Sequence, residues 1–258
     1  MKKISILCLF LGLGMTTIAQ QQQQNANAEQ YKKVQQLANL GQCKDGLAII
    51  EGLVKQDSSN ANYLAYNSYL LAKVWHDKQL DEGQTMPHYN VALNLAKKAI
   101  KLDSNNAETQ YCYAFTVGVM NEFASNKQQL ANAQIMKNHI DKCLKLNPQH
   151  SGAYHLLGRW SRRIAEFNGV EKFAVKTLYG TTLPVATFQD AANAFEKAYV
   201  YASDYLIHQY ELAYTYYEMN KYADAKVWLN QVIANTTYKG DDAQMVKDKC
   251  KKLLEKMN

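Results

Sequence analysis

Basic side chains gather in one short stretch of the sequence, YHLLGRWSRRIAEF, at residues 154–167. Within it, His155, Arg159 and Arg162 are separated by four and then three residues, so a helix would place all three on one face. A guanidinium group presents a planar set of N–H donors that matches a carboxylate. The stretch therefore predicts a basic helical face that binds a peptide or an acidic ligand.

The alternative interpretation of this stretch is structural. Arg159 and Arg163 would then pair with acidic residues of the same chain or cap carbonyl groups. The candidate partners are Glu166, Glu171 and Asp190. Trp160 lies on the opposite side of such a helix and is expected in the core.

Elsewhere the sequence shows no pattern of a catalytic or metal site. The six histidines lack the H-E-x-x-H spacing, and the glycines form neither a P-loop nor G-x-G-x-x-G. Ser161 has no base and orienting group arranged around it in the sequence. We therefore expect a protein that is not an enzyme, with no catalytic residues, cofactor or metal.

Four cysteines follow the N-terminal segment, and none belongs to a C-x-x-C pair. They are Cys43, Cys112, Cys143 and Cys250. One hypothesis is a disulfide between Cys112 and Cys143, which the repeat pattern places on neighbouring helices. The other is that all four are small apolar side chains inside the core.

The N-terminal segment predicts export. Residues 1–19, MKKISILCLFLGLGMTTIA, combine two lysines, an apolar run too short to span a bilayer and a small-x-small cleavage site. This is the pattern of a cleavable signal peptide with a short basic region typical of bacteria. It predicts a periplasmic or secreted protein with no membrane span in the mature chain. Residues 20–30 are rich in glutamine and predict a flexible tether.

The composition of residues 31–258 predicts an all-α domain. The whole chain of 258 residues has only 3 prolines and 12 glycines, and few runs alternate between apolar and polar residues. The net charge is +6 and falls to about +4 without Lys2 and Lys3. That excess is too small to predict nucleic-acid binding, which needs a concentrated basic face.

An internal repeat organises this domain. The segment ELAYTYYEMNKYADAKVWLNQVI, Glu211–Ile233, resembles a tetratricopeptide (TPR) unit, with small residues at Ala213 and Ala225. Two antiparallel helices cross closely at such positions, so a larger side chain would push them apart. The last small position of one unit precedes the first of the next by 15 residues in four cases: Leu53 and Ser68, Ala99 and Ala114, Cys143 and Gly158, Ala198 and Ala213.

Distances inside the units vary. Val34–Leu53 and Ala213–Val232 span 19 residues, whereas the three middle units span 31, 29 and 40, which implies insertions of 12, 10 and 21 residues. We expect the insertions to lengthen the first helix of a hairpin or to add a helix on one side. The sequence thus predicts a TPR-like α-solenoid of about five helical hairpins, with insertions in the middle three and a C-terminal capping helix at Asp241–Met257.

The fourth unit carries a family resemblance. Its shared features are H-L-L-G-R-W from His155, an E-K pair at Glu171, a loose A-x-x-L-Y-G ending at Gly180, P-x-A-T from Pro184 and F-x-K-A from Phe195. In these features the chain resembles the regulator of microtubule dynamics family. The resemblance implies a TPR-like helical protein without known enzymatic chemistry, whose animal members are associated with microtubules. Residues 1–19 depart from those members, so we expect the fold and not the microtubule role.

In TPR proteins, side chains at fixed offsets from the small position of the first helix line a concave groove. The same offsets here select Tyr69, Tyr111, Phe115, His155, Arg159, Arg162, Tyr210, Tyr214 and Tyr217. We therefore predict an exported, non-catalytic scaffold that binds a protein or peptide through a Tyr- and Arg-lined groove. Two alternatives stay open: a small-molecule binder or enzyme that uses a pocket made by the insertion at residues 159–187, and a structural component of the cell envelope.

Overall fold

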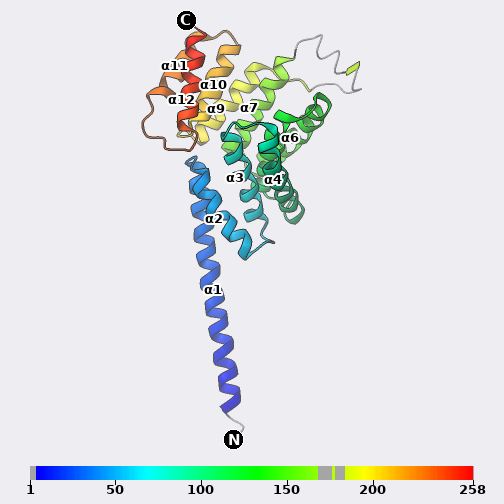
Figure 1. Cartoon of the computed structure of the whole chain (residues 1–258), viewed down its shortest axis with the longest axis vertical. Coiled ribbons are helices and arrows are strands. Elements are labelled where there is room, and N and C mark those ends of the chain that lie inside the picture. Colours follow the sequence, from blue (N-terminus) through cyan, green and yellow to red (C-terminus); the bar gives the residue numbers. More distant parts are fainter. Residues whose placement is uncertain (1–3, 168–175, 178–183, 258) are drawn as a thin grey trace.

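The computed structural model describes residues 4–167, 176–177 and 184–257, with the backbone alone for residues 4–19. This part of the chain consists of helices and connecting segments (Figure 1). The helices are α1 (Ile4–Asn39), α2 (Cys43–Gln56), α3 (Ala61–Asp77), α4 (Glu82–Leu102), α5 (Ala107–Met120), the short 3-10 helix η1 (Asn121–Phe123), α6 (Asn126–Leu146), α7 (Ser151–Glu166), α9 (Phe188–Tyr201), α10 (Leu206–Glu218), α11 (Tyr222–Ala234) and α12 (Ala243–Glu255).

Consecutive helices pair into five hairpins, as the repeat pattern predicts. The pairs are α1 with α2, α3 with α4, α5 with α6, α7 with α9, and α10 with α11, and α12 then packs on α10 and α11. The first helices of successive hairpins also contact one another in the case of α3 with α5 and α5 with α7. The predicted all-α solenoid with a C-terminal capping helix is therefore confirmed.

The constant spacing of 15 residues has a chemical basis in the turns between hairpins. Asp57, Asp103 and Asn147 end α2, α4 and α6, and each side chain accepts a hydrogen bond from the backbone N–H two residues further on. Three residues after each of them, the side chain of Asn60, Asn106 or His150 caps the next helix. The same short turn thus repeats three times. All eight residues separated by this spacing are buried.

The insertions of the second and third hairpins lie mainly in their second helices. Helices α4 and α6 have 21 residues each, whereas α2 has 14. These helices begin early in the inserted sequence, and Asp81 and Ser125 cap their N-termini. The two side chains accept hydrogen bonds from the backbone N–H groups of Gln84 and Gln128. The expectation that the first helix lengthens, or that a helix is added, accounts for the smaller part: α3 has 17 residues against 13 in α10, and η1 adds a short 3-10 helix after α5. The fourth insertion lies largely outside the described residues.

Helix α1 extends well beyond its partner α2 (Figure 1). The structure places residues 20–30 within this helix, where the sequence analysis expects a flexible tether. Alanine and glutamine are good helix formers, and nearly all side chains of this stretch are exposed. Intrinsic propensity, and not packing, therefore accounts for helix in this stretch. Among the residues that the structure describes, no helix is long and apolar enough to cross a membrane.

The two ends of the repeat array meet. The segment that joins α11 to α12 reaches the turn between α1 and α2, where the backbone N–H of Asp241 donates to the carbonyl of Gly41 at 2.8 Å. The next residue, Asp242, accepts a hydrogen bond from the Lys73 ammonium of α3 at 3.1 Å and another from the Tyr238 hydroxyl at 2.8 Å. The array therefore closes on itself, and α12 lies against its concave side.

Candidate functional site

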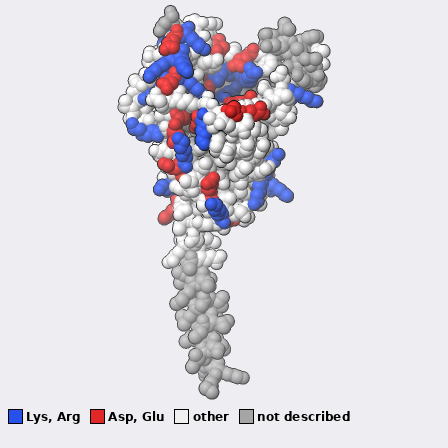
Figure 2. Space-filling view, in the orientation of Figure 1, with Lys and Arg blue, Asp and Glu red and all other residues white. Residues whose placement is uncertain are grey.

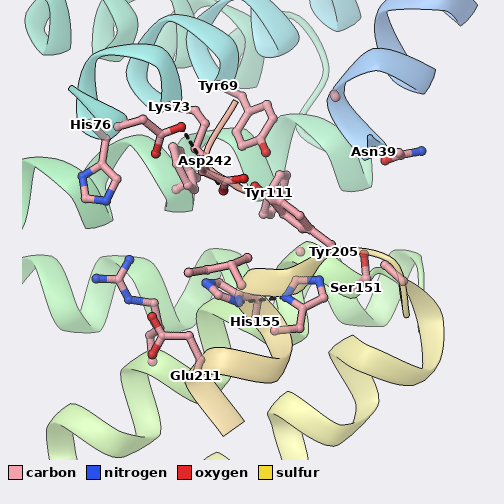
Figure 3. A pocket seen from close by; sticks show the side chains of 18 of the residues that line it. Asn39, Tyr69, Lys73, His76, Tyr111, Ser151, His155, Tyr205, Glu211 and Asp242 are labelled. Atoms are coloured by element: carbon pink, nitrogen blue, oxygen red, sulfur yellow. Dashed lines mark hydrogen bonds and ion pairs between the residues drawn. The ribbon is translucent and has the colours of Figure 1, made fainter. Parts of the chain in front are cut away.

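A cavity of about 240 Å³ lies inside the closed array (Figure 3). Its walls come from the end of α1, from the first helices α3, α5, α7 and α10, from η1, and from α12 with its lead-in segment. Among the described residues, none that lies within a second helix lines it. Aromatic rings cover much of the wall. They belong to Tyr66, Tyr69, Tyr111, Phe115 and Tyr205. The concave side that the repeat predicts is therefore a partly open pocket and not a long open groove.

Five of the nine predicted groove residues line this cavity: Tyr69, Tyr111, Phe115, His155 and Arg159. The ring of Tyr69 lies 4.8 Å from that of Phe115 and 5.3 Å from that of Tyr111, measured between ring centroids. The offsets that apply to TPR units thus identify correctly which faces of α3, α5 and α7 point inward. These three rings form one aromatic wall, and Figure 3 shows Tyr69 and Tyr111 across the cavity from His155.

Arg162 does not line the cavity, although it shares a helical face with Arg159. Its guanidinium group forms an ion pair with the carboxylate of Glu211 and also donates to the Thr215 hydroxyl at 3.2 Å. It lies over the ring of Tyr214 at 4.7 Å. Burial alone would raise the pKa of the Glu211 carboxyl, but the neighbouring Arg162 lowers it overall. Arg162 therefore joins α7 to α10.

The other two arginines of the stretch form weaker pairs. Arg163 pairs with Glu166, one of the expected partners, at 3.0 Å, and its side chain is 63% exposed. Arg159 lies 3.7 Å from Glu122 of η1, which was not among the expected partners. Asp190 instead forms a capping box with Thr187 at the start of α9, and Glu171 lies outside the described residues. Among the three arginines of this stretch, Arg159 is thus the one that lines the cavity, and its ion pair with Glu122 is the longest of the three.

The three tyrosines of α10 that the offsets select do not reach the cavity either. Tyr210, Tyr214 and Tyr217 pack against the apolar cluster that α10 shares with α11 and α12. Their rings follow one another at centroid distances of 6.3 Å and 6.1 Å. The capping helix covers the part of the concave face that these offsets select. On α10, the cavity is lined instead by Ile207, His208 and Glu211.

A histidine pair crosses the cavity wall between α7 and α10. The Nδ1 atoms of His155 and His208 are 3.0 Å apart, and the dashed line at His155 in Figure 3 marks this contact. Burial lowers the pKa of His208 to about 4 and that of His155 well below its ordinary value of 6.5. Both rings are therefore neutral near pH 7, and the N–H of one Nδ1 donates a hydrogen bond to the other Nδ1.

Carboxylates outnumber cations in the cavity wall. The carboxylates are Asp77, Glu108, Glu122, Glu211 and Asp242, and the cations are Lys73, Arg159 and Lys249. Lys73 is buried between two of the carboxylates, with its Nζ 2.5 Å from Asp77 and 3.1 Å from Asp242. Arg162 supplies one further positive charge from outside the wall, so the balance stays slightly negative.

Several cavity residues were missed by the sequence analysis, but helical spacing carries a signal for part of them. Lys73 and His76 follow Tyr69 by four and seven residues, so they continue its inward face by two turns of α3. His208 and Tyr205 have no comparable signal, because they precede the predicted face of α10. Their position depends on where the capping helix lies.

A second hollow of about 320 Å³ lies between α5, α6 and α7. Trp160, which closes one side of it, is buried and donates from its indole N–H to the carbonyl of Ala133 at 3.0 Å, so its predicted place in the core is confirmed. The alternative of a pocket made by residues 159–187 concerns this region. Residues 168–175 and 178–183 lie outside the described part of the chain.

The described cysteines and acidic side chains offer no metal site. Cys43, Cys112, Cys143 and Cys250 are buried and have free thiols, as in the second of the two hypotheses. Within the described residues, no group of three or more His, Cys, Asp or Glu side chains is placed to hold a metal ion. On the face shown in Figure 2, Lys and Arg are interspersed with Asp and Glu, so its described part is a mixed and not a uniformly basic surface.

The stacked hairpins, the repeated turns and the concave cavity define a helical-repeat protein of the TPR class. A solved structure supports this: a thermophilic TPR protein of Thermus thermophilus matches with a TM-score of 0.58 at 14% sequence identity, covering 88% of this chain and 99% of that one. A likeness at this level of identity shows the fold alone.

The family model described as regulator of microtubule dynamics protein 1-3 matches residues 30–258, and the chain belongs to this family. Regulator of microtubule dynamics protein 1 of Bos taurus is 27% identical over 159 residues, which cover 60% of this chain and 49% of that protein. Regulator of microtubule dynamics protein 3 of Rattus norvegicus is 28% identical over 198 residues, which cover 72% and 41%. The chain thus spans about half the length, or less, of the curated relatives it matches.

Proposed function

We propose that this protein is a non-catalytic scaffold that captures a short peptide segment of a partner protein in the cavity between its hairpins. The single observation that carries the proposal is the inward convergence of an aromatic wall, a histidine pair and Arg159 from four successive first helices. Binding sites of small size commonly combine apolar walls with a few placed polar groups. Rigid aromatic side chains contribute contact area at a low cost in conformational entropy.

The size of the cavity limits what enters it. A space of about 240 Å³ accepts one or two side chains with their backbone, and not a folded domain. Arg159 lies on the wall with its side chain 39% exposed, so it remains accessible to an incoming segment. The partner would therefore present an exposed loop or terminus, with the outer surface of the hairpins free for further contacts.

A pair of charge reversals on α7 tests the proposal. Random heptapeptides displayed on phage would be selected on the purified protein, and the enriched peptides measured by fluorescence anisotropy. Arg159→Glu should weaken their binding by about tenfold or more, because it replaces the accessible N–H donors of the guanidinium group with a carboxylate that cannot donate to peptide carbonyl groups. Arg163→Glu is the matched control, since it makes the same charge change on an exposed side chain of the same helix outside the cavity.

Thermal unfolding of both variants separates binding from folding. Both should melt within a few degrees of the original protein, because exposed ion pairs contribute only about 0–1 kcal/mol. If Arg159→Glu unfolds the protein, the arginine has a structural role. If no enriched peptide distinguishes the two variants, peptide capture in the cavity is refuted.

A second candidate function is the binding of a free small molecule. The observation that favours it is the closure of the array, in which Asp241 and Asp242 join the C-terminal end to α1 and α3. To test this candidate, the protein would be incubated with a library of apolar and amphipathic metabolites. Native mass spectrometry of the intact protein would then detect any bound molecule. A stoichiometric adduct that Arg159→Glu leaves unchanged would favour this candidate over a peptide.

We infer in addition that the protein is exported. The residues that support this are the two N-terminal lysines, the apolar run and the small-x-small site at residues 17–19. Expression of the full chain in a bacterial host, followed by intact mass measurement of the periplasmic fraction, tests it. The expected mature protein begins at Gln20. A protein of full-length mass that stays in the cytosol would contradict the inference.

A further inference from the structure

Among the described residues, two buried ring nitrogens of the cavity make no hydrogen bond: the Nε2 of His150, which lies 3.5 Å from the Glu108 carboxylate, and the Nε2 of His208. The Nε2 atom of His208 is buried and makes no hydrogen bond, and the residue is only 1% exposed. His208 lines the cavity from α10, and its Nδ1 is already engaged with His155. A buried polar atom without a partner costs free energy, so it commonly marks a place where a ligand or water is received.

The hydrogen bond between the two Nδ1 atoms determines what the pair can offer. When both rings are neutral, each carries one N–H and one unprotonated nitrogen. If His155 donates from Nδ1, then the Nε2 of His208 is an N–H and that of His155 is an acceptor. If His208 donates, the two Nε2 atoms exchange these roles. In either arrangement the pair presents one donor and one acceptor.

The charges of the wall disfavour an anionic ligand group. Five carboxylates and three cations line the cavity, and the most deeply buried cation, Lys73, is held between Asp77 and Asp242. Arg159 lies beside Glu122. A ligand carboxylate would therefore enter a wall with no surplus of positive charge, whereas an uncharged amide group would not meet this repulsion.

We propose that His155 and His208 recognise an uncharged amide group of the ligand, whose N–H and C=O satisfy the acceptor and donor of the pair while its apolar part packs on the Tyr69 and Phe115 wall. The inference rests on the proposed function and specifies it. The captured group is an internal peptide group or a side-chain carboxamide, and not the carboxylate of a peptide C-terminus.

Three small probes of one shape test this recognition. Phenylpropanamide has a donor and an acceptor, methyl phenylpropanoate has acceptors only, and phenylpropanoate has a charged carboxylate. Binding to the full chain would be measured by ligand-observed NMR titration. The amide should bind about tenfold tighter than the other two, because each of them leaves one nitrogen of the pair unsatisfied.

Variants of two histidines link this preference to the pair. His208→Phe keeps a ring of similar size and removes the nitrogens, so the preference for the amide should disappear. His139→Phe is the control, because His139 contacts Gln110 at 2.6 Å and does not line the cavity. Thermal unfolding would report whether each variant is folded.

A measurement on the original protein covers the case in which His208→Phe does not fold. With ¹⁵N-labelled histidine, the Nε2 resonances of both rings should shift during titration with the amide. Absence of such a shift overturns the inference, as does equal or tighter binding of phenylpropanoate, or a preference that persists in His208→Phe. These outcomes leave peptide capture itself to the Arg159→Glu comparison, so the two proposals fail separately.

Discussion

Arg159 and Arg162 lie three residues apart on α7 and share a face, yet their surroundings differ. The Arg162–Glu211 pair is about nine-tenths buried, and its guanidinium group is also held by Thr215. The side chains of Arg159 and Glu122 are 39% and 42% exposed and 3.7 Å apart. Two arginines on the same face of α7 therefore have different roles. Arg162 holds two helices together, and Arg159 is available to a ligand.

This difference predicts unequal costs of removing the two charges. Arg162→Gln should lower the free energy of unfolding by about 3–5 kcal/mol, because it leaves the Glu211 carboxylate buried without its partner. Arg159→Gln should cost about 0–1 kcal/mol, since its ion pair is exposed. Urea unfolding followed by circular dichroism measures both. Equal losses in the two variants would contradict the assigned roles.

The buried histidines predict that stability falls in mild acid. His208 has a pKa of about 4 in the folded protein, against an ordinary value of 6.5 that applies when the chain is unfolded. Between these values the unfolded chain binds a proton that the folded protein does not. The contribution of His208 is thus fully present above about pH 6.5 and is lost as pH falls toward 4, at about 1.4 kcal/mol per pH unit.

Urea unfolding at intervals of about one pH unit, from neutral to about pH 4.5, measures this loss. His155, whose pKa is also lowered by burial, should steepen it. His208→Asn should show a shallower dependence over the same window, because an asparagine side chain does not titrate and only His155 of the pair remains. A flat stability profile across the window would show that the histidines are not buried as neutral groups.

At the scale of helices, small residues decide how closely partners approach. Gly158 on α7 lies against the ring of Phe195 on α9, and a Cβ atom added there would come within 2.7 Å of two ring atoms. Phe195 is itself fully buried, so its ring has no free space to move into. This contact explains why the repeat has its smallest residue at this position.

Gly158→Ala should therefore destabilise the protein by about 1–3 kcal/mol through overpacking. Gly52→Ala is the matched control, because Gly52 lies within α2 and an added Cβ would meet nothing within 4 Å. This second substitution should stabilise the protein by up to about 1 kcal/mol through helix propensity. Thermal unfolding of both variants tests the prediction, which is refuted if the two shift in the same direction.

At the scale of the whole molecule, closure of the array depends on a few contacts between distant segments. One is the buried cluster in which Lys73 forms ion pairs with both Asp77 and Asp242. Another is the backbone hydrogen bond from Asp241 to Gly41. Gly41 adopts φ of +71°, and a Cβ there would overlap the Tyr238 hydroxyl. A glycine is therefore needed where the C-terminal segment meets the first hairpin.

The cluster predicts an asymmetry between its members. Lys73→Met should cost about 3–5 kcal/mol, because two buried carboxylates lose their cation. Asp242→Asn keeps the pair of Lys73 with Asp77 and an acceptor for Tyr238, so its cost should be smaller, about 1–3 kcal/mol. Urea unfolding measures both costs, and hydrogen exchange should show faster opening of α12 in each. An equal or larger cost for Asp242→Asn would contradict this account.

Local pattern determined the hairpins and their class. The spacing of 15 residues follows from a short turn whose Asp, Asn and His side chains bond within a few residues of their own position, so the sequence alone reveals it. The inward faces of α3, α5 and α7 follow from helical periodicity in the same way. Early caps such as Asp81 also lie in the sequence, but insertion length alone did not show which helix would take the added residues.

Only the tertiary structure decided that the concave side is closed. Asp241 contacts Gly41 across 200 positions of the chain, and His155 meets His208 across 53. Whether such residues meet depends on small rotations between neighbouring hairpins that add up along the whole array. A periodic sequence specifies each local pairing of helices but not this sum, so the cavity and the unpartnered Nε2 atom of His208 depend on the complete superhelix.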